Sequence, residues 1–507
     1  MKGAVGKIYG EASSFEFNFV IFNQKQVKRG DYVKVWNDVD GWVVAYVEDI
    51  VAKSNVRSRE IKEIVNGASE VFIGKAVVLG KREDGRLRIP RSPFVPGESV
   101  FLAEEKLIAE VLGLSNEGVY IGLLGDTGVK VKLDPNSLVQ KHVCILAKTG
   151  SGKSYTAGVI IEELLEHNVP LLIIDPHGEY HSMKYPNENV DGEFGIKPRG
   201  YAEQIRIAVP PISPFADKAD EILVLDGVNL TAEELIELTG LKNPTAQALL
   251  YQALKELKDE DYTIRDIIDE VEKIKHNGKW TLLGALTKVE ESGLFGERPT
   301  DIRNLLQRGK ATIIDLRGVE PAYQDLIVSR VCTKLFELRK REEVEPGMIV
   351  IEEAHNFIPE RGFDRAVSTG ILRTIASEGR KFGLGLMVIS QRPARVDKNV
   401  ISQCNTQIIL RVTNPNDINA IRNGVEGITA EMVEEIKRLP PGNAMIVSPE
   451  LERPVIVRVR SRKSRHGEAV SVTAPKAKAK KKEAKKKKEK GKEKKKEKKG
   501  FLRRLFG

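Results

Sequence analysis

Residues 147–154 read Ala-Lys-Thr-Gly-Ser-Gly-Lys-Ser and follow directly on the apolar run His-Val-Cys-Ile-Leu at residues 142–146. With a helix expected over residues 155–167, this order is typical of a phosphate-binding loop, whose backbone N–H groups converge on phosphate oxygens at the positive end of a helix. In such a loop Lys153 reaches the β- and γ-phosphates and the Ser154 hydroxyl holds Mg²⁺. The stretch predicts binding of a nucleoside triphosphate, with contacts from Lys148, Thr149, Gly150, Ser151, Gly152, Lys153, Ser154 and Tyr155.

Length and composition bound the class of protein. A chain of 507 residues is long enough for roughly two or three domains with their own cores. The three cysteines lie far apart without metal-ligand spacing, which is typical of a reduced intracellular protein. The N-terminus lacks the apolar region of a signal peptide, and the longest apolar run, near residues 169–174, is too short to cross a bilayer. We therefore expect a soluble, cytoplasmic protein with no integral membrane association.

The positive charge of the chain is concentrated at its C-terminus. The net charge is +9, yet residues 476–507 hold 16 Lys, 2 Arg and 4 Glu and so carry +14, which leaves −5 for residues 1–475. Residues 476–499 are too charged to bury a core, and we expect them to be disordered. They form either a solvated tether or a sequence-independent contact to DNA phosphates. The apolar and Arg residues within 501–507 are typical of a docking peptide for a partner groove or an anionic surface.

The region before the phosphate loop shows a pattern of short strands separated by turn residues. Such a pattern over about the first 90 residues is typical of a small β-barrel or sandwich. Further strands lead from there into the loop. The expected strands cover residues 15–22, 32–36, 42–47, 71–79, 99–103, 118–122 and 129–132.

After the phosphate loop, strands and helices alternate, which predicts a parallel sheet with helices on both faces. The expected strands are apolar through their middle, as doubly covered strands must be. Ligands of such sheets bind at the carboxyl ends of the strands. We expect residues 230–295 to be helical throughout and to interrupt this alternation as an insertion. The expected strands cover residues 143–147, 171–175, 311–316, 348–352 and 385–390.

Two carboxylates end one of the expected strands. Met-Ile-Val-Ile-Glu-Glu at residues 348–353 places Glu352 where many P-loop ATPases have an Asp that reaches Mg²⁺, while Glu353 can polarise the attacking water. Because adjacent strand residues point to opposite faces, we expect the two side chains to make different contacts. The alternative is that both are solvated carboxylates at the start of a loop. Because the same chain contains a phosphate loop, this is the weaker interpretation.

A second polar motif, Asp-Pro-His-Gly-Glu-Tyr at residues 175–180, follows another strand. Asp175 or Glu179 could supplement the metal or water site at the same edge of the sheet. His177 either touches phosphate or is an ordinary polar loop residue, and the sequence leaves both open.

Two further residues stand near the last expected strand of the sheet. Gln391 comes just after it, where an amide that senses the γ-phosphate would lie. Arg380 closes the helix expected at residues 368–379, and its guanidinium is suited to charge on a transferring phosphoryl group, often in a neighbouring subunit. The alternative for Arg380 is a positive side chain that complements the helix dipole.

These motifs occur in one order along residues 1–460: a barrel, the phosphate loop, Asp-Pro-His-Gly-Glu-Tyr, the helical insertion, Ile-Glu-Glu-Ala-His at residues 351–355, Glu-Gly-Arg-Lys-Phe-Gly at residues 378–383, and Ser-Gln-Arg-Pro at residues 390–393. This order resembles the HerA branch of the HerA/FtsK hexameric DNA translocases. The resemblance implies a RecA-like motor that forms a homo-hexamer and pumps double-stranded DNA. It also implies an N-terminal barrel that docks a NurA-type nuclease for DNA end resection.

The resemblance implies roles for single residues as well. It assigns Lys153 and Ser154 to nucleotide and metal, Glu353 to catalysis, Arg380 to a finger acting in the neighbouring subunit, and Gln391 to sensing. It further implies a basic nucleotide contact just before the strand of the phosphate loop, where this chain has Lys141. The chain departs from the pattern at Ala147, for Gly, and at Glu352, for the commoner Asp, and we expect the chemistry to survive both changes.

We therefore expect an α/β fold: a RecA-like P-loop ATPase core with a helical insertion, a small N-terminal β-barrel before it and a disordered basic C-terminal tail. The expected domains are a HAS-barrel-like domain at residues 1–92, the core at residues 93–229 and 301–462, the insertion at residues 230–300, and a Lys-rich tail at residues 463–507.

The predicted activity is ATP hydrolysis coupled to DNA translocation, with ATP and Mg²⁺ as cofactors, in double-strand-break repair and homologous recombination. The predicted catalytic residues are Glu353, Arg380 and Gln391, and the predicted metal ligands are Ser154, Glu352 and Asp175. Two alternatives remain open. One is a membrane-associated secretion or conjugation ATPase of the same superfamily, and the other is a nucleotide-dependent DNA clamp without translocation.

Overall fold

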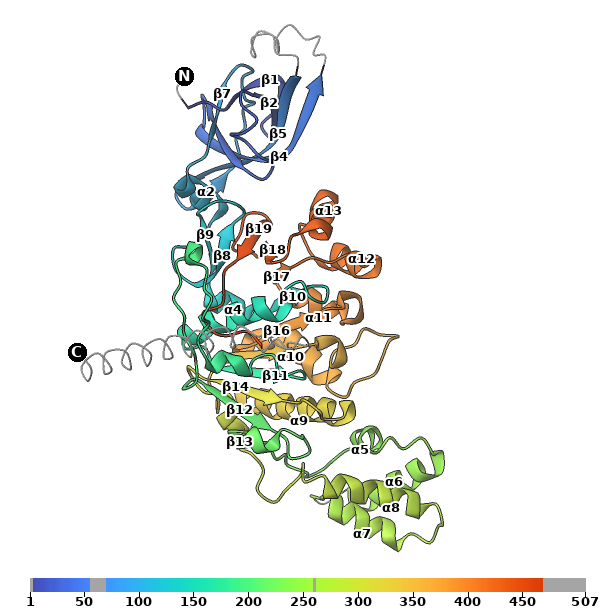
Figure 1. The fold of residues 1–507 in the computed structure, drawn as a ribbon. Coiled ribbons are helices and arrows are strands. Elements are labelled where there is room, and N and C mark those ends of the chain that lie inside the picture. Colours follow the sequence, from blue (N-terminus) through green and yellow to red (C-terminus); the bar gives the residue numbers. More distant parts are fainter. Residues whose placement is uncertain (1–2, 55–69, 259–260, 468–507) are drawn as a thin grey trace, which may run out of the picture. The chain divides into compact units, whose positions relative to one another are not determined.

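The computed structural model describes residues 3–54, 70–258 and 261–467. Two β-sheets and a group of helices make up this part of the chain (Figure 1). The tail expected to be disordered and the apolar peptide at its end lie outside the described residues, from residue 468 onward. The structure corrects the expected start of that tail at residue 463. Ser464 is fully buried and forms hydrogen bonds to Glu162 of the core.

A closed barrel forms the N-terminal part, as the pattern of short strands predicts. Its strands pair in the order β2-β1-β7-β3-β4-β5, and β5 pairs back onto β2, while short β6 extends β5. Alternate side chains fill the interior, for example Phe17 and Phe19 from β2 and Val33 and Val35 from β3. The strands are β1 (Gly6–Ala12), β2 (Glu16–Ile21), β3 (Tyr32–Asn37), β4 (Gly41–Ser54), β5 (Glu70–Glu83), β6 (Arg86–Arg88) and β7 (Ser99–Leu102).

A 12-stranded sheet carries the phosphate loop. Its strands β13-β12-β14-β11-β15-β16-β10-β17 are parallel, and β18, β19, β8 and β9 extend it in antiparallel pairs. Strand β16 separates β10, which leads into the phosphate loop, from β15, which leads into Glu352. The bounds are β8 (Val119–Leu124), β9 (Lys130–Leu133), β10 (Val143–Leu146), β11 (Leu171–Asp175), β12 (Ile205–Val209), β13 (Glu221–Ile222), β14 (Ala311–Asp315), β15 (Gly347–Ile351), β16 (Leu384–Ser390), β17 (Thr406–Ile409), β18 (Asn443–Val447) and β19 (Val455–Val459).

Helices cover both faces of the parallel strands. In β10, Val143 and Ile145 belong to one core, which includes apolar residues of α4, whereas Cys144 and Leu146 belong to another, which includes residues of α9 and α10. This alternation follows from the two-residue period of a strand and explains why the strands read as continuous apolar runs. The helices are α2 (Glu105–Leu112), α3 (Pro135–Gln140), α4 (Lys153–Glu166), α9 (Pro321–Lys340), α10 (Thr369–Phe382), α11 (Lys398–Gln403), α12 (Pro415–Gly424) and α13 (Ala430–Arg438).

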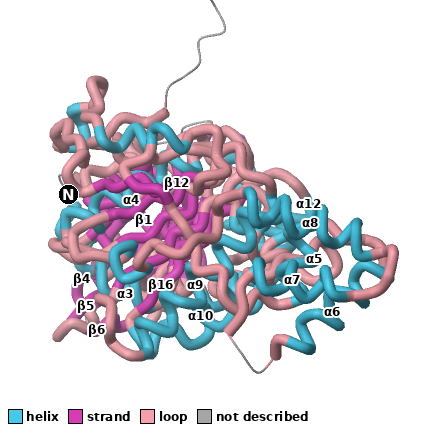
Figure 2. Tube along the Cα trace, turned by 90° about the horizontal axis from the view of Figure 1, so that it is seen from below, coloured by secondary structure: helices cyan, strands magenta, loops and turns pink. Residues whose placement is uncertain are grey.

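The helical insertion lies where the sequence predicts it. Figure 2 shows its helices, α5 (Ala232–Thr239), α6 (Pro244–Glu256), α7 (Ile264–Lys273) and α8 (Lys279–Glu291), as one cyan group. Thr231 and Thr263 begin α5 and α7 with reciprocal capping bonds to Glu234 and Asp266. Helices α5 and α7 therefore start at signals that are local in the sequence.

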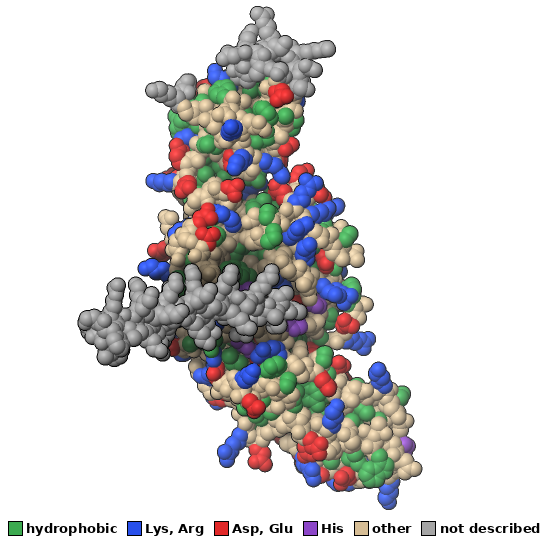
Figure 3. Space-filling model, viewed as in Figure 1, with side chains coloured by type: hydrophobic (Ala, Val, Ile, Leu, Met, Phe, Trp, Pro, Cys, Tyr) green, Lys and Arg blue, Asp and Glu red, His purple; other side chains and the backbone are tan. Residues whose placement is uncertain are grey.

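The described surface carries charges of both signs. On the face shown in Figure 3, Lys and Arg side chains are interspersed with Asp and Glu. This mixture agrees with the small net charge of the chain before its tail. None of the described helices is long and apolar enough to cross a membrane.

Candidate active site

The phosphate loop connects β10 to α4, as predicted. Gly150 and Gly152 have φ angles of 77° and 98°, a region of backbone conformation that favours glycine. The Ser151 hydroxyl donates a hydrogen bond to the Lys148 carbonyl at 2.5 Å and closes the loop on itself. Helix α4 begins at Lys153, so the unpaired N–H groups of its first turn meet the loop. The loop thus has the geometry of a phosphate cradle.

The ammonium group of Lys153 lies between two carboxylates. It forms an ion pair with Oε1 of Glu352 and lies 3.0 Å from Oε1 of Glu353. Burial alone would lower the pKa of Lys153, but the two carboxylates outweigh burial and raise that pKa above its ordinary value. The same burial raises the pKa of Glu352, which Lys153 partly offsets. Lys153 is therefore charged and holds both carboxylates beside the loop.

The backbone of Glu353 explains how both carboxylates reach one lysine. Strand β15 ends at Ile351, and Glu353 has a φ of 50°, which is uncommon for a residue with a side chain. The expectation that Glu352 and Glu353 make different contacts because they alternate on a strand is therefore wrong, since neither lies within the strand. Conformations of this kind are concentrated at functional sites.

One oxygen of Glu353 is open to a further donor. Its Oε2 is buried and accepts no hydrogen bond from the described residues. It lies 3.3 Å from Nδ1 of His355, and burial lowers the pKa of that imidazole. The unpaired Oε2 gives Glu353 an acceptor oxygen, the group that orients an attacking water.

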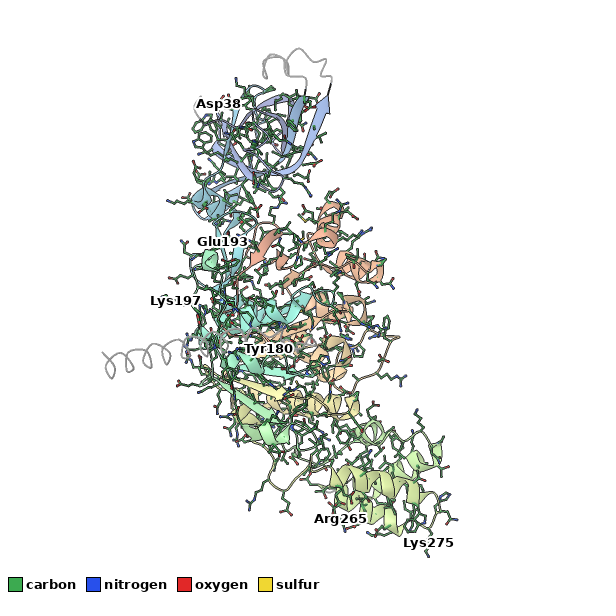
Figure 4. The ribbon with its side chains drawn as sticks, in the orientation of Figure 1. Asp38, Tyr180, Glu193, Lys197, Arg265 and Lys275 are labelled. Atoms are coloured by element: carbon green, nitrogen blue, oxygen red, sulfur yellow. The ribbon has the colours of Figure 1, made fainter. Side chains whose placement is uncertain are left out.

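Ser154 and Glu352 fit a magnesium ion. The Ser154 hydroxyl lies 3.0 Å from Oε1 of Glu352, so two oxygen ligands of the kind Mg²⁺ prefers meet beside the loop. Tyr180 donates its hydroxyl to Oε2 of Glu352 at 3.0 Å, and burial raises the pKa of Tyr180 well above its usual value. In the sequence Tyr180 is only the last residue of a motif, and no signal there predicts this hydrogen bond. Figure 4 labels Tyr180 inside the core. It also labels Glu193 and Lys197, which belong to the same connection between β11 and β12 but lie at the periphery of the core.

Asp175 does not present a free carboxylate to this site. Its Oδ1 accepts hydrogen bonds from the backbone N–H groups of His177, Gly178 and Glu179, and its Oδ2 accepts one from Tyr180. Both oxygens of Asp175 are thus already engaged by backbone donors of the turn. The structure therefore corrects the prediction that Asp175 is a metal ligand: the side chain is fully buried and shapes the turn that carries Tyr180.

Gln391 lies at the phosphate loop, where the sequence predicts a sensing amide. Thr149 of the loop donates its hydroxyl to Oε1 of Gln391. The preceding residue, Ser390, has its hydroxyl oxygen 3.2 Å from Nδ1 of His355. The end of β16 thus contacts both the loop and the neighbour of Glu353.

Arg380 and Lys141 lie at the amino ends of the parallel strands, opposite the carboxyl ends that carry the phosphate loop. Arg380 is exposed in the last turn of α10, just before β16 begins, and Lys141 comes just before β10. Strand β16 is 7 residues long, which corresponds to about 20 Å and exceeds the reach of an arginine side chain. Arg380 therefore cannot serve the phosphate loop of its own chain. The same geometry corrects the prediction that Lys141 contacts a nucleotide bound in its own subunit.

Tyr155 contacts a segment that the sequence assigned in part to the tail. Its hydroxyl accepts a hydrogen bond from the backbone N–H of Arg462 at 2.8 Å. Arg460 and Arg462 are fully buried. The sequence offers no signal for this, because isolated arginines near a basic tail look like surface residues.

The fold and the site together define the class of protein: a P-loop nucleoside triphosphatase with a RecA-like core. A family model described as "Helicase HerA, central domain" matches residues 119–335, and one described as "HAS barrel domain" matches residues 5–84. The chain is 30% identical to the DNA double-strand break repair helicase HerA of Pyrococcus furiosus, over 92% of this chain and 94% of that protein. It belongs to the HerA helicase family.

A second curated relative and one solved structure are less similar to the chain. The protein of the same name from Sulfurisphaera tokodaii is 27% identical, over 90% of this chain and 92% of the relative. The solved structure of VirB4 from Thermoanaerobacter pseudethanolicus is similar with a TM-score of 0.49 and 17% identity, over 68% of this chain and 97% of that chain.

Proposed function

We propose that this protein is an ATP-driven translocase or helicase that acts on double-stranded DNA as a homo-hexameric ring. We further propose that a NurA-type nuclease binds its barrel, and that the two proteins act in DNA end resection and homologous recombination. Membership of the HerA family supports this proposal, since relatives carry the name of DNA double-strand break repair helicases. The observation that carries it is that the buried carboxylates of Glu352 and Glu353 both form ion pairs with Lys153, beside the phosphate loop.

The contacts of the site support a division of roles. Lys153 exchanges the two carboxylates for the β- and γ-phosphates when ATP binds. Ser154 and Glu352 would hold Mg²⁺, which neutralises phosphate charge when bound. The open oxygen of Glu353 orients the water for attack, and Gln391, bonded to the loop through Thr149, reports the presence of the γ-phosphate.

The position of Arg380 supports a ring. An exposed guanidinium at the edge of the sheet opposite the phosphate loop can reach a bound nucleotide only in another subunit. In a ring, the side of one subunit that carries Arg380 would face the phosphate loop of its neighbour. Arg380 would then stabilise the phosphoryl charge in the neighbouring subunit.

The barrel offers apolar surface to a partner. Trp36 and Trp42 are opposite each other on β3 and β4, with ring centroids 5.5 Å apart, and they are 45% and 39% exposed. The ring of Trp42 also packs edge-on against Phe101 of β7 at 5.6 Å. Exposed aromatic clusters of this kind mark interaction sites, which supports docking of a nuclease at the barrel.

The decisive experiment measures ATP turnover and displacement of a triplex-forming oligonucleotide from linear duplex DNA. Duplex-stimulated turnover with displacement, both absent in Glu353→Gln, is the expected result. Stimulated turnover without displacement would favour the clamp, and turnover stimulated by anionic liposomes instead of DNA would favour the secretion class. Nuclease docking is checked by co-purification, which Trp36→Asp should abolish while turnover persists.

A further inference from the structure

Residues 460–466, which we call the C-terminal strap, are fixed along α4 by a buried ionic cluster. Arg460 lies 3.0 Å from Oε2 of Glu162 and 2.9 Å from Oε1 of Glu163. Lys463 lies 2.7 Å from Oε1 of Glu163 and 2.6 Å from Oε2 of Glu166. A shift of the strap along the helix would separate these buried charges, so the cluster sets the register of the strap on the helix.

The opposite side of the strap is held by the connection that follows Tyr180. The N–H of Asn187 donates to the Lys463 carbonyl at 2.9 Å, and the N–H of Arg465 donates to the Tyr185 carbonyl at 2.9 Å. Ser182 donates its hydroxyl to the Arg465 carbonyl, also at 2.9 Å. Contacts on both sides therefore fix the position of the strap. They also fix the position of its last residue, His466.

That place is beside Tyr155, in the first turn of the phosphate-loop helix. The rings of Tyr155 and His466 pack edge to face, with centroids 5.3 Å apart and planes at 80°. The strap approaches so closely because position 158 is glycine: a Cβ on Gly158 would lie 2.6 Å from Cζ of Arg462. The close approach, the buried cluster and the aromatic pair all bring His466 next to the nucleotide loop.

His466 is an exposed, uncharged aromatic ring with one hydrogen-bond donor. Nη1 of Arg462 lies 3.0 Å from Nδ1 of His466 and can only donate, so Nδ1 accepts and Nε2 carries the ring proton. Burial of part of the ring and the charge of Arg462 lower the pKa of His466 to about 4, which keeps the ring neutral at physiological pH. A neutral aromatic face with a donor is suited to stack on a base and bond a ring nitrogen.

We propose that Tyr155 and His466 form the binding site for the adenine base of the nucleotide. Ser154 would hold the metal and phosphates, and Tyr155 lies beside it in the first turn of α4, so a sugar and base that pass this turn come next to the aromatic pair. The proposal rests on ATP binding at the phosphate loop. It gives the C-terminal strap a direct part in nucleotide recognition, in addition to its place in the core.

The test compares ATP with inorganic tripolyphosphate, which lacks sugar and base, by isothermal titration with Mg²⁺ present. His466→Ala should weaken ATP binding roughly 5- to 150-fold, the range expected when a base loses one stacking partner, and leave tripolyphosphate binding unchanged. His466→Phe keeps an aromatic face and should recover most of the ATP affinity. His276→Ala, the same change at a histidine of the helical insertion, should alter neither.

Each other outcome overturns the proposal. Equal losses for ATP and tripolyphosphate in His466→Ala would show that the ring supports the loop and not the base, and no loss for either would show that the base lies elsewhere. Wild-type protein that binds tripolyphosphate as tightly as ATP would refute a base site while leaving the phosphate loop intact. Failure to bind either ligand would instead refute the proposed nucleotide function itself.

Discussion

Tyr180 donates its hydroxyl to Oε2 of Glu352 at 3.0 Å, in a part of the site where the glutamate is fully buried. A donor to an ionised carboxylate stabilises the charged form, so Tyr180→Phe should raise the pKa of Glu352 and weaken its hold on Mg²⁺. We expect a several-fold higher Mg²⁺ concentration for half-maximal ATPase activity. An Mg²⁺ titration at fixed ATP measures this.

Tyr201→Phe is the matched control for that variant. Tyr201 is also buried and donates to a carboxylate, Glu166, at 2.7 Å, but on the outer part of α4. It should lower the melting temperature without changing the Mg²⁺ requirement. Identical Mg²⁺ curves for Tyr180→Phe and wild type would contradict a role of Tyr180 in holding Glu352.

Lys153 and Glu353 should fail at different steps. Lys153→Ala removes the cation that meets the phosphates and should abolish both nucleotide binding and turnover. Glu353→Gln retains the lysine and should bind ATP normally, with turnover reduced by about 10² to 10⁴, the usual contribution of a general base. Titration with a fluorescent nucleotide beside steady-state ATPase assays separates the two. Equal loss of affinity in both variants would remove Glu353 from its proposed role.

Arg380→Ala should nearly abolish turnover with little change in ATP affinity, because arginine fingers contribute roughly 10³ to 10⁵ in rate and act on the developing charge. Mixing Arg380→Ala with Glu353→Gln subunits should restore some activity. A subunit with intact Glu353 then receives Arg380 from a neighbour, as the separation of the two sheet edges requires. Energy transfer between labelled subunits must first show that mixed rings form. Proven mixed rings without recovered ATPase activity at any ratio would exclude action between subunits.

Gly158→Ala should destabilise the protein although alanine is the better helix former. The new Cβ would meet the buried guanidinium of Arg462 at 2.6 Å, and overpacking of this kind costs about 1–3 kcal/mol. Gly284→Ala in α8 is the control, because its Cβ would meet nothing within 4 Å and should stabilise by up to about 1 kcal/mol. Chemical denaturation of both variants measures the two opposite signs. A stabilised Gly158→Ala would mean that the strap moves aside freely.

Deletion of residues 476–507 should weaken DNA binding and flatten its dependence on salt. The deleted residues carry +14, and each phosphate that the shortened protein no longer neutralises should reduce the steepness of log K against log salt by roughly 0.9. ATPase activity should still saturate with DNA, since the truncated protein keeps every residue of the proposed ATP site. Binding curves at several salt concentrations check this, and equal slopes for full-length and truncated protein would favour a simple tether.

The sequence by itself determined the elements whose signals are local. The phosphate loop, the apolar runs of the parallel strands and the helical insertion were all predicted where they lie, because glycine spacing, strand period and capping residues act within a few neighbouring positions. It also identified Glu352, Glu353 and Gln391 as residues that follow strand ends, and parallel topology brings such ends to one edge. Strands such as β1 and β12 were missed, since their runs are short and interrupted by charged residues.

Only the tertiary structure decided which of these residues share a contact. The backbone turn at Glu353 lets two adjacent carboxylates contact Lys153. Glu352 and Glu353 lie 199 and 200 positions from that lysine along the chain. Pairings across that distance depend on the order of strands in the sheet, and no local pattern encodes them. The same order places Arg380 and Lys141 at the edge opposite the phosphate loop. It also buries Arg460 and Arg462 on α4, where Glu162 and Glu163 compensate their charge.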